Sequence, residues 1–251
     1  MRNISEEETR RVLSEALQPG DDVMIHASLS ALGTFERGPD AIIDALSDAV
    51  GPAGTVIMMT DTRSFAKTGR FSVDQPSETG LLTEQFRQRP GVRRSVVPMV
   101  SFAAAGARAA EYLQTYHSHL DATAPITRLL ENDGKILLLG IGYAKCTLYH
   151  LAEERHASPY NFYKTFQGSL VEENREIAPV SQRYFVRSDM TVKKDPSVAG
   201  QMLEKRCQVK MLTLGNGVVR AFRARDFDAC CMDALAADPD AFLATRPQPE
   251  T

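Results

Sequence analysis

Apolar and polar positions follow two different periods along the first sixty residues. Residues 22–28, DVMIHAS, and residues 54–59, GTVIMM, are short apolar runs of the kind that form buried strands. Between them, residues 39–50 repeat their apolar positions with helical spacing, with Pro39 at the start and Gly51 after the end. This order predicts a strand, a helix and a second strand, and therefore a parallel sheet.

The alternation continues along the chain and then changes character. Helical patterns in GLLTEQFRQ, ARAAEYLQ and ITRLLEND, the last between Pro125 and Gly134, precede KILLLGIG, the strongest strand signal. Farther on, GSLVEENREIAPVSQRYFV indicates antiparallel strands, VKMLTLGNGVVRAFRA indicates a hairpin around Gly215, Asn216 and Gly217, and residues 226–235 indicate a final helix. We therefore expect a single α/β domain over residues 1–251, with a mixed sheet, helices on both faces and antiparallel strands near the C-terminus.

Two segments stand outside this alternation. Ser5 and Glu8 have capping-box spacing at the start of an amphipathic N-terminal pattern, which predicts a helix rather than a signal peptide. Residues 60–79 are polar and aperiodic, and a loop of that length inside a domain is usually functional or mobile. The apolar runs are too short to span a membrane, so we expect a soluble, cytoplasmic protein.

Composition excludes several classes of protein without selecting a partner. Hydrophobic residues make up 43%, charged residues 24%, and the net charge is -3, which excludes disordered and collagen-like chains and gives no basic excess for nucleic acid. The four cysteines form no CxxC pair, which favours reduced thiols. We expect no nucleic-acid, membrane or metal partner; a homo-oligomer is compatible with the sequence but is not indicated by it.

A single histidine follows the strongest strand signal, in the segment AKCTLYHLAEE. His150 falls in the first turn of a predicted helix, near the strand ends where α/β sheets place their ligands. The helix dipole should lower its pKa and keep the imidazole neutral, as a general base requires. Glu153 and Glu154 follow at helical spacing and could instead hold His150 in a purely structural contact. From the residues alone both interpretations remain open.

Other candidate sites carry weaker signals. Residues 24–38, MIHASLSALGTFERG, open from a strand into small and polar residues that could bind an anion or a pantetheine arm, although an ordinary strand-to-helix loop is the simpler interpretation. His117 and His119 could join His150 at a metal ion, but a solvated loop is the simpler interpretation. The sequence contains no GxSxG, GxxxxGK[ST] or GxGxxG motif, which argues against serine hydrolases, phosphoryl transfer and dinucleotide binding.

Four segments in order resemble the aminoglycoside 3-N-acetyltransferase family. They are IHASLSALGTFERGPDAIIDALSDAVGPAGTVIMMT, RRSVVPMVSFAAAG, APITRLLENDGKILLLGIGYAKCTLYHLAEE and GNGVVRAFRARDFDACCMDALAADPDAFL. Members of this family transfer an acetyl group from acetyl-CoA to an amine on an α/β fold. The resemblance therefore implies acetyl-CoA as co-substrate, a small-molecule amine as acceptor, and a place in antibiotic resistance or antibiotic biosynthesis.

The resemblance also implies roles for individual residues. The family's histidine base falls on His150, Thr147 and Glu153 match the same motif, and Asp61 is the candidate for an aspartate that orients the histidine or binds the amine. Coenzyme A is expected to lie against nine residues: His26, Ala27, Ser28, Leu29, Ser30, Leu32, Gly33, Arg94 and Ser95.

The sequence departs from the family pattern at three positions. Val97 replaces a usual histidine, Cys146 a usual asparagine, and Val186 an expected carboxylate. Fewer carboxylates weaken recognition of polycationic aminoglycosides, because desolvated ammonium groups need paired anions, so we expect a different amine. The alternatives are a diverged member that binds acyl-CoA but catalyses condensation or cyclisation, a catalytically silent binding module, and a metal-dependent hydrolase built on His117, His119 and His150.

Overall fold

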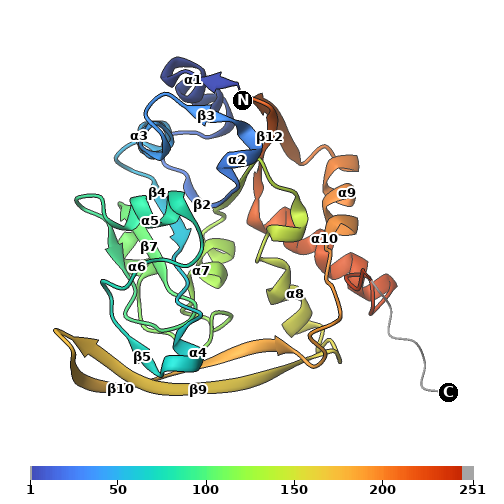
Figure 1. Cartoon of the computed structure of the whole chain (residues 1–251). Helices are drawn as coiled ribbons and strands as arrows, with labels where there is room; N and C mark the ends of the chain where they lie inside the picture. The colour runs from blue at the N-terminus through green and yellow to red at the C-terminus, as the bar shows by residue number, and fades with distance from the viewer. Residues whose placement is uncertain (1, 245–251) are drawn as a thin grey trace.

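The computed structural model, which describes residues 2–244, is organised by a seven-stranded mixed sheet (Figure 1). Strand β2 pairs in parallel with both β4 and β8, and the other neighbouring strands pair antiparallel. The sheet order is β11 (Val209–Leu214), β12 (Gly217–Arg223), β8 (Lys135–Leu139), β2 (Asp22–Ala27), β4 (Thr55–Met59), β7 (Phe102–Gly106) and β6 (Arg93–Arg94). The predicted parallel βαβ unit and the hairpin around Asn216 are confirmed.

Helices cover both faces of this sheet, as expected from the sequence. On one face, α1 (Glu6–Ala16), α3 (Pro39–Val50) and α5 (Leu81–Arg87) share a hydrophobic core with Val23 and Ile25 of the central strand. The side chain of Ser5 caps α1 by accepting a hydrogen bond from the backbone N–H of Glu8 at 3.1 Å. The alternation of side chains along a strand sends Met24 to the opposite face, so the central strands are apolar on both sides.

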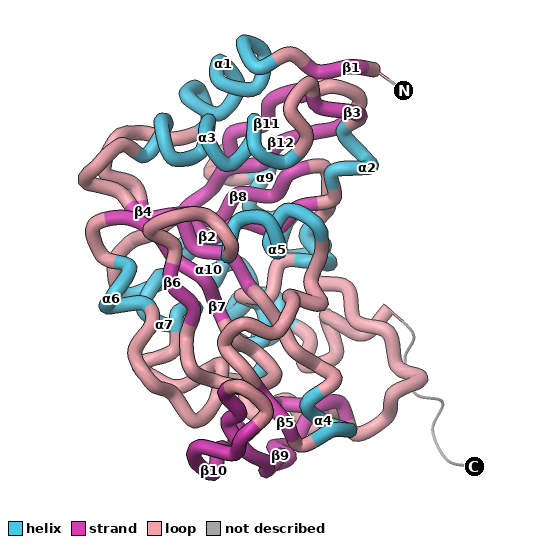
Figure 2. Tube along the Cα trace, turned by 60° about the vertical axis from the view of Figure 1, so that its left-hand side comes forward, coloured by secondary structure: helices cyan, strands magenta, loops and turns pink. Residues whose placement is uncertain are grey.

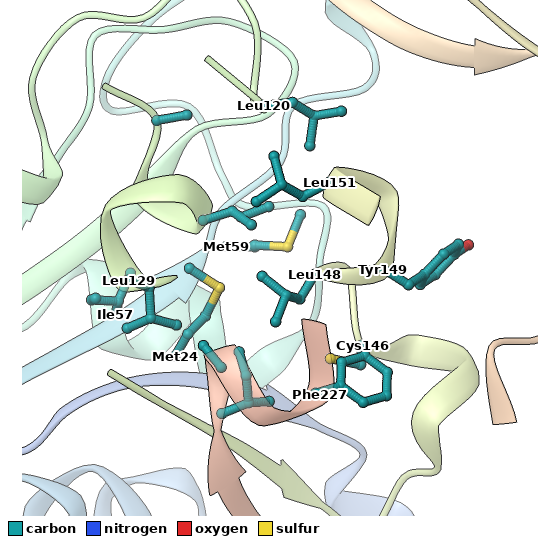
Figure 3. Close-up of a cluster of buried hydrophobic side chains, with 14 of the residues drawn as sticks. Met24, Ile57, Met59, Leu120, Leu129, Cys146, Leu148, Tyr149, Leu151 and Phe227 are labelled. Atoms are coloured by element: carbon teal, nitrogen blue, oxygen red, sulfur yellow. The ribbon is translucent and has the colours of Figure 1, made fainter. Parts of the chain in front are cut away.

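The second face carries the helices from the later part of the chain. These are α6 (Ala109–Tyr112), α7 (Pro125–Glu131), α8 (Tyr149–Arg155), α9 (Ser197–Lys205) and α10 (Ala224–Ala237). Figure 3 shows Leu148 and Leu151, at the start of α8, pointing toward Met59, whereas Tyr149 points away from this group. The apolar residues of α8 thus fix the rotation of the helix that carries His150.

The long antiparallel strands expected near the C-terminus form a sheet of their own. Strands β9 (Asn161–Glu172) and β10 (Arg175–Arg187) pair with β5 (Arg70–Phe71), and Figure 2 shows this sheet below the main one, with α4 (Phe65–Thr68) beside it. Gly168 allows the contact, because a Cβ atom there would lie 2.0 Å from the carbonyl oxygen of Gly69. Hydrophobic alternation predicted these strands correctly but did not reveal their partner.

Residues 60–79, expected as an irregular loop, are partly regular. They contain α4 and β5, and they are held by the side chain of Arg94, which donates hydrogen bonds to the carbonyl oxygens of Thr60, Val73 and Gln75. None of the helices in residues 2–244 has both the length and the apolar character needed to cross a lipid bilayer. The remaining short elements are β1 (Asn3–Ile4), α2 (Leu29–Leu32), β3 (Thr34–Phe35) and the 3₁₀ helix η1 (Tyr143–Lys145).

Candidate active site

A cavity of about 780 Å³ opens at the carboxyl ends of the parallel strands β2 and β4. Its wall is formed by the end of β2 with the start of α2, by the end of β4, by residues 79–83 at the start of α5, and by residues from Ile141 to His150 after β8. Ligands of open α/β sheets bind at this edge, outside the carboxyl ends of the strands. The volume is that of a site for a ligand of cofactor size.

His150 lines the cavity and is held by a buried carboxylate. Its Nδ1 atom lies 2.8 Å from Oε2 of Glu153, one turn farther along α8. The Glu153 side chain is 0% exposed, while that of His150 is 24% exposed. Because an ionised carboxylate only accepts hydrogen bonds, Nδ1 carries the hydrogen and Nε2 keeps its lone pair. The arrangement leaves one imidazole nitrogen able to accept a proton.

The electrostatic surroundings favour the neutral imidazole. Loss of water on burial lowers the pKa of His150 below its ordinary value, Lys194 and Arg187 act in the same direction, and Glu153 opposes them. Burial alone would raise the pKa of Glu153, but its contacts with His150 and Lys194 outweigh that and hold it below its ordinary value. The sequence predicted the direction of the His150 shift, but its main cause is burial rather than the helix dipole.

Asp61 lies in the cavity wall just after β4 and is 1% exposed. Its Oδ2 atom accepts a hydrogen bond from Nε of Arg63 at 3.1 Å, and no partner for Oδ1 is found in residues 2–244. Burial raises the pKa of Asp61 to about 6, although Arg63 opposes this. The carboxylate in contact with His150 is that of Glu153, and no hydrogen bond between Asp61 and His150 is found in residues 2–244.

Five of the residues expected to bind coenzyme A come together in the wall: His26, Ala27, Ser28, Leu29 and Ser30. The Nε2 atom of His26 is buried and has no hydrogen-bond partner in the described part of the chain. Burial lowers the pKa of His26 to about 4, so the ring is neutral at physiological pH. This segment offers a ligand a neutral imidazole and the hydroxyl groups of two serines.

The other four, Leu32, Gly33, Arg94 and Ser95, lie outside the lining of the cavity. Leu32 is 0% exposed in the core, and the backbone carbonyl of Arg2 lies 2.6 Å from where a Cβ atom of Gly33 would stand. Arg94 is occupied with residues 60–75, and Ser95 accepts a hydrogen bond from the Phe102 N–H at 3.0 Å. Their contact with coenzyme A stays a prediction, and their observed contacts are structural.

Several residues of the site were not singled out from the sequence. Lys194 donates a hydrogen bond to Oε2 of Glu153 at 2.8 Å across 41 residues of sequence, and nothing in the local pattern marks it. Arg63 and Lys145 also line the cavity.

The histidines of the HSH pair do not form a metal site with His150. The ring of His119 is buried and lies 6.4 Å from that of His150, centroid to centroid, but His117 is exposed. Within residues 2–244 no three histidine, cysteine or acidic side chains are grouped in a way that could hold a metal ion. The metal-dependent alternative is therefore not supported.

Comparison with known proteins gives consistent matches over most of the chain. The family model described as aminoglycoside 3-N-acetyltransferase matches residues 24–236. Aminoglycoside N(3)-acetyltransferase IV from Salmonella sp is 28% identical over 241 residues, which cover 93% of this chain and 87% of the relative.

Solved structures show the same fold. The apoenzyme of aminoglycoside acetyltransferase AAC(3)-IVa superposes with a TM-score of 0.79 at 26% identity, covering 98% of this chain and 93% of the other. The AAC-IIIb complex with CoASH superposes with a TM-score of 0.79 at 24% identity and covers 98% and 100% of the two chains.

Proposed function

Because this chain belongs to the aminoglycoside 3-N-acetyltransferase family, we propose that it moves an acetyl group from acetyl-CoA to an amine of a small molecule, with His150 as general base. The observation that carries this proposal is the hydrogen bond between Nδ1 of His150, a residue that lines the cavity, and the buried Glu153; no hydrogen bond to Nε2 is found in residues 2–244. An acetyl acceptor has to lose a proton as its nitrogen bonds to the carbonyl carbon, and a neutral imidazole at the reaction site supplies the base.

The proposed reaction is a direct transfer within a ternary complex. The amine nitrogen bonds to the thioester carbon while Nε2 of His150 takes the proton from nitrogen. Backbone N–H groups near the strand ends stabilise the oxyanion. The carbon–sulfur bond then breaks, the thiolate takes the proton from the imidazolium, and the products are the N-acetylated amine and coenzyme A.

The two substrates divide the cavity between them in this proposal. Coenzyme A lies along residues 26–30, where small residues and hydroxyl groups allow close approach of the pantetheine arm. The acceptor lies nearer Asp61, whose buried Oδ1 atom has no hydrogen-bond partner in the described residues. The acceptor is an aminoglycoside-like molecule or another biosynthetic amine.

Thiol release tests this proposal. The wild-type protein and His150→Gln are incubated with acetyl-CoA and a panel of amines, and free coenzyme A thiol is measured. We expect turnover to fall by about 10²-fold or more in the variant, the usual contribution of a general base, with coenzyme A binding nearly unchanged. His117→Gln is the matched control, because His117 is exposed and does not line the cavity.

The same assay separates the alternatives. Equal turnover in His150→Gln would overturn the assignment of the base. Saturable coenzyme A binding without thiol release from any amine would favour a binding module. Thiol release with a product mass other than that of the acetylated amine would favour a member with changed chemistry.

A further inference from the structure

Lys194 and His150 contact the same carboxylate oxygen. Nζ of Lys194 and Nδ1 of His150 each lie 2.8 Å from Oε2 of Glu153. The lysine comes from the segment between β10 and α9, and its side chain is 5% exposed. A buried ammonium is costly unless it is paired, and here it lies against the oxygen that the imidazole uses.

Lys194 is held in this place by several other groups. Its Nζ atom donates a hydrogen bond to Oδ1 of Asn161 at 2.5 Å and lies 5.3 Å from the ring centre of Tyr160. The backbone of Lys194 forms a β-bridge with Leu243. The backbone of Lys194, an amide, an aromatic ring and a carboxylate therefore hold the ammonium in place. These contacts fix the side-chain conformation in which Lys194 meets Glu153.

We propose that Lys194 is a positioning residue for the base: it clamps Glu153 and keeps His150 neutral, with the hydrogen on Nδ1. This role rests on the proposed function of His150. A second positive charge beside Glu153 weakens the attraction between the carboxylate and an imidazolium. Without that charge, a protonated His150 would be stabilised as one half of a buried ion pair and would be unable to accept the proton of the amine.

The charged and titratable groups around His150 agree with this role. Glu153 and Tyr149 approach from its own helix, Lys194 from the segment before α9, Arg187 from β10, and His119 from the segment before α7. Glu153 alone favours the imidazolium, and Lys194 and Arg187 oppose it. His119, whose pKa burial lowers to about 3, contributes no charge.

Histidine NMR tests the proposal without substrate. The ring nitrogens of the protein labelled at histidine with ¹⁵N are titrated, and the His150 signals are assigned with His150→Gln. We expect the wild-type ring to be the neutral Nδ1–H tautomer at neutral pH. In Lys194→Met the midpoint should rise by about one unit or more, which is a tenfold gain in proton affinity.

Three variants control this measurement. Lys194→Gln keeps a hydrogen-bond donor but removes the charge, and it should shift the midpoint as Lys194→Met does; it also answers the question if the methionine variant fails to fold. Lys194→Arg should stay within about 0.3 unit of wild type, because the charge is retained. Lys193→Met removes a neighbouring exposed lysine and should change nothing.

The outcomes distinguish this proposal from the proposed function. A midpoint that stays at the wild-type value in both Lys194→Met and Lys194→Gln would overturn the role of Lys194. With the role intact, the acid limb of the kcat/KM profile moves to higher pH in step with the NMR midpoint. An unchanged turnover in His150→Gln, with the NMR shift still present, would instead refute the catalytic role of His150 alone.

Discussion

Asp61 and Arg63, two residues apart in the chain, form an ion pair in the wall of the cavity, with Oδ2 of Asp61 accepting from Nε of Arg63 at 3.1 Å. The pair is asymmetric, because the Asp61 side chain is 2% exposed and that of Arg63 is 71% exposed. Water therefore screens the cation but not the carboxylate, which explains why burial still raises the pKa of Asp61 to about 6.

The first prediction concerns stability and pH. The pKa of Asp61 is raised from 3.8 to about 6 on folding, so the folded state disfavours the charged form. This penalty is absent below the pKa of the unfolded state, grows as the pH rises toward about 6 and is complete above it. A rise in pKa of roughly two units corresponds to about 3 kcal/mol of unfolding free energy. Asp61→Asn removes this titration. The free energy of unfolding of the variant, relative to that of wild type, should therefore increase as the pH rises from about 4 to about 6.

Urea unfolding of both proteins at several pH values checks this. A constant difference between the two proteins from acid to neutral pH would contradict the prediction. Asp74→Asn is the control, because Asp74 belongs to the same segment but does not line the cavity.

The second prediction concerns the charge of the acceptor. Among residues 2–244, Asp61 is the one carboxylate that lines the cavity, and Arg63 already occupies one of its oxygens. Arg63 and Lys145 add positive charge to the wall. We expect amines with one or two positive charges to give higher kcat/KM than aminoglycosides with four or five, by about tenfold or more, because unpaired ammonium groups lose their hydration without compensation.

A panel of amines of similar size and increasing charge, assayed by thiol release, tests this. A rise of kcat/KM with acceptor charge would contradict it. Added salt should reduce the penalty for the most highly charged acceptors, since their repulsion by Arg63 and Lys145 is screened.

The third prediction concerns Arg94, whose guanidinium donates hydrogen bonds to Thr60, Val73 and Gln75. Removing it takes the hydrogen bonds from the partly buried carbonyl groups of Val73 and Gln75, whereas the carbonyl group of Thr60 keeps the hydroxyl of Ser101 as a donor. Arg94→Ala should therefore lower the free energy of unfolding by about 2 to 4 kcal/mol. Hydrogen exchange in residues 60–79 should become faster. Arg93→Ala is the control, because Arg93 is exposed.

Coenzyme A binding to the same pair of variants decides between two roles of Arg94. If the Kd for coenzyme A rises no more than the loss of folded protein accounts for, the arginine acts only by holding residues 60–79 in place. A Kd raised far more in Arg94→Ala at a temperature where the protein stays folded would support the direct contact implied by the family resemblance.

The fourth prediction concerns His26 as a contact for coenzyme A. Its buried Nε2 atom has no partner in the described part of the chain, and a ligand that provides one gains a hydrogen bond without displacing another. We expect His26→Ala to raise the Kd for coenzyme A by about tenfold, measured by calorimetry. Because burial lowers the pKa of His26 to about 4, this affinity should not change between pH 6 and 8 through His26. An unchanged Kd would remove His26 from the binding site.

Local pattern explains which parts of the fold could be predicted from the sequence. The unit β2–α3–β4 follows from hydrophobic period and from Pro39 and Gly51 at the helix ends. The contact between His150 and Glu153 follows from their spacing on one helix. Helix α9 was missed because it contains Gly200, a poor helix former; the glycine is required where the ring of Tyr143 packs, since a Cβ atom would lie 2.1 Å from it.

The contacts that could not be predicted depend on distant segments. Lys194 reaches Glu153 only after the long hairpin has crossed beneath the main sheet, and no local period encodes that path. Arg94 belongs to a motif that resembles a cofactor contact of the family. In the structure its side chain instead donates hydrogen bonds to carbonyl groups of residues 60–79. The sequence thus singled out His150 and Glu153, which the structure brings into contact, but not the residues that surround them.

The hairpin of β9 and β10 has two ends with different constraints. At the end of the hairpin near α8, Asn161 accepts a hydrogen bond from Lys194, and the charge of Arg187 helps to lower the pKa of His150. The turn at Glu173 and Asn174 lies at the opposite end, remote from α8 (Figure 1). Strands of this length extend about 40 Å, at roughly 3.4 Å per residue. The turn can therefore be lengthened, changed in sequence or labelled without altering the contacts of Asn161 and Arg187 at the other end of the hairpin. It is a suitable place to attach a reporter group.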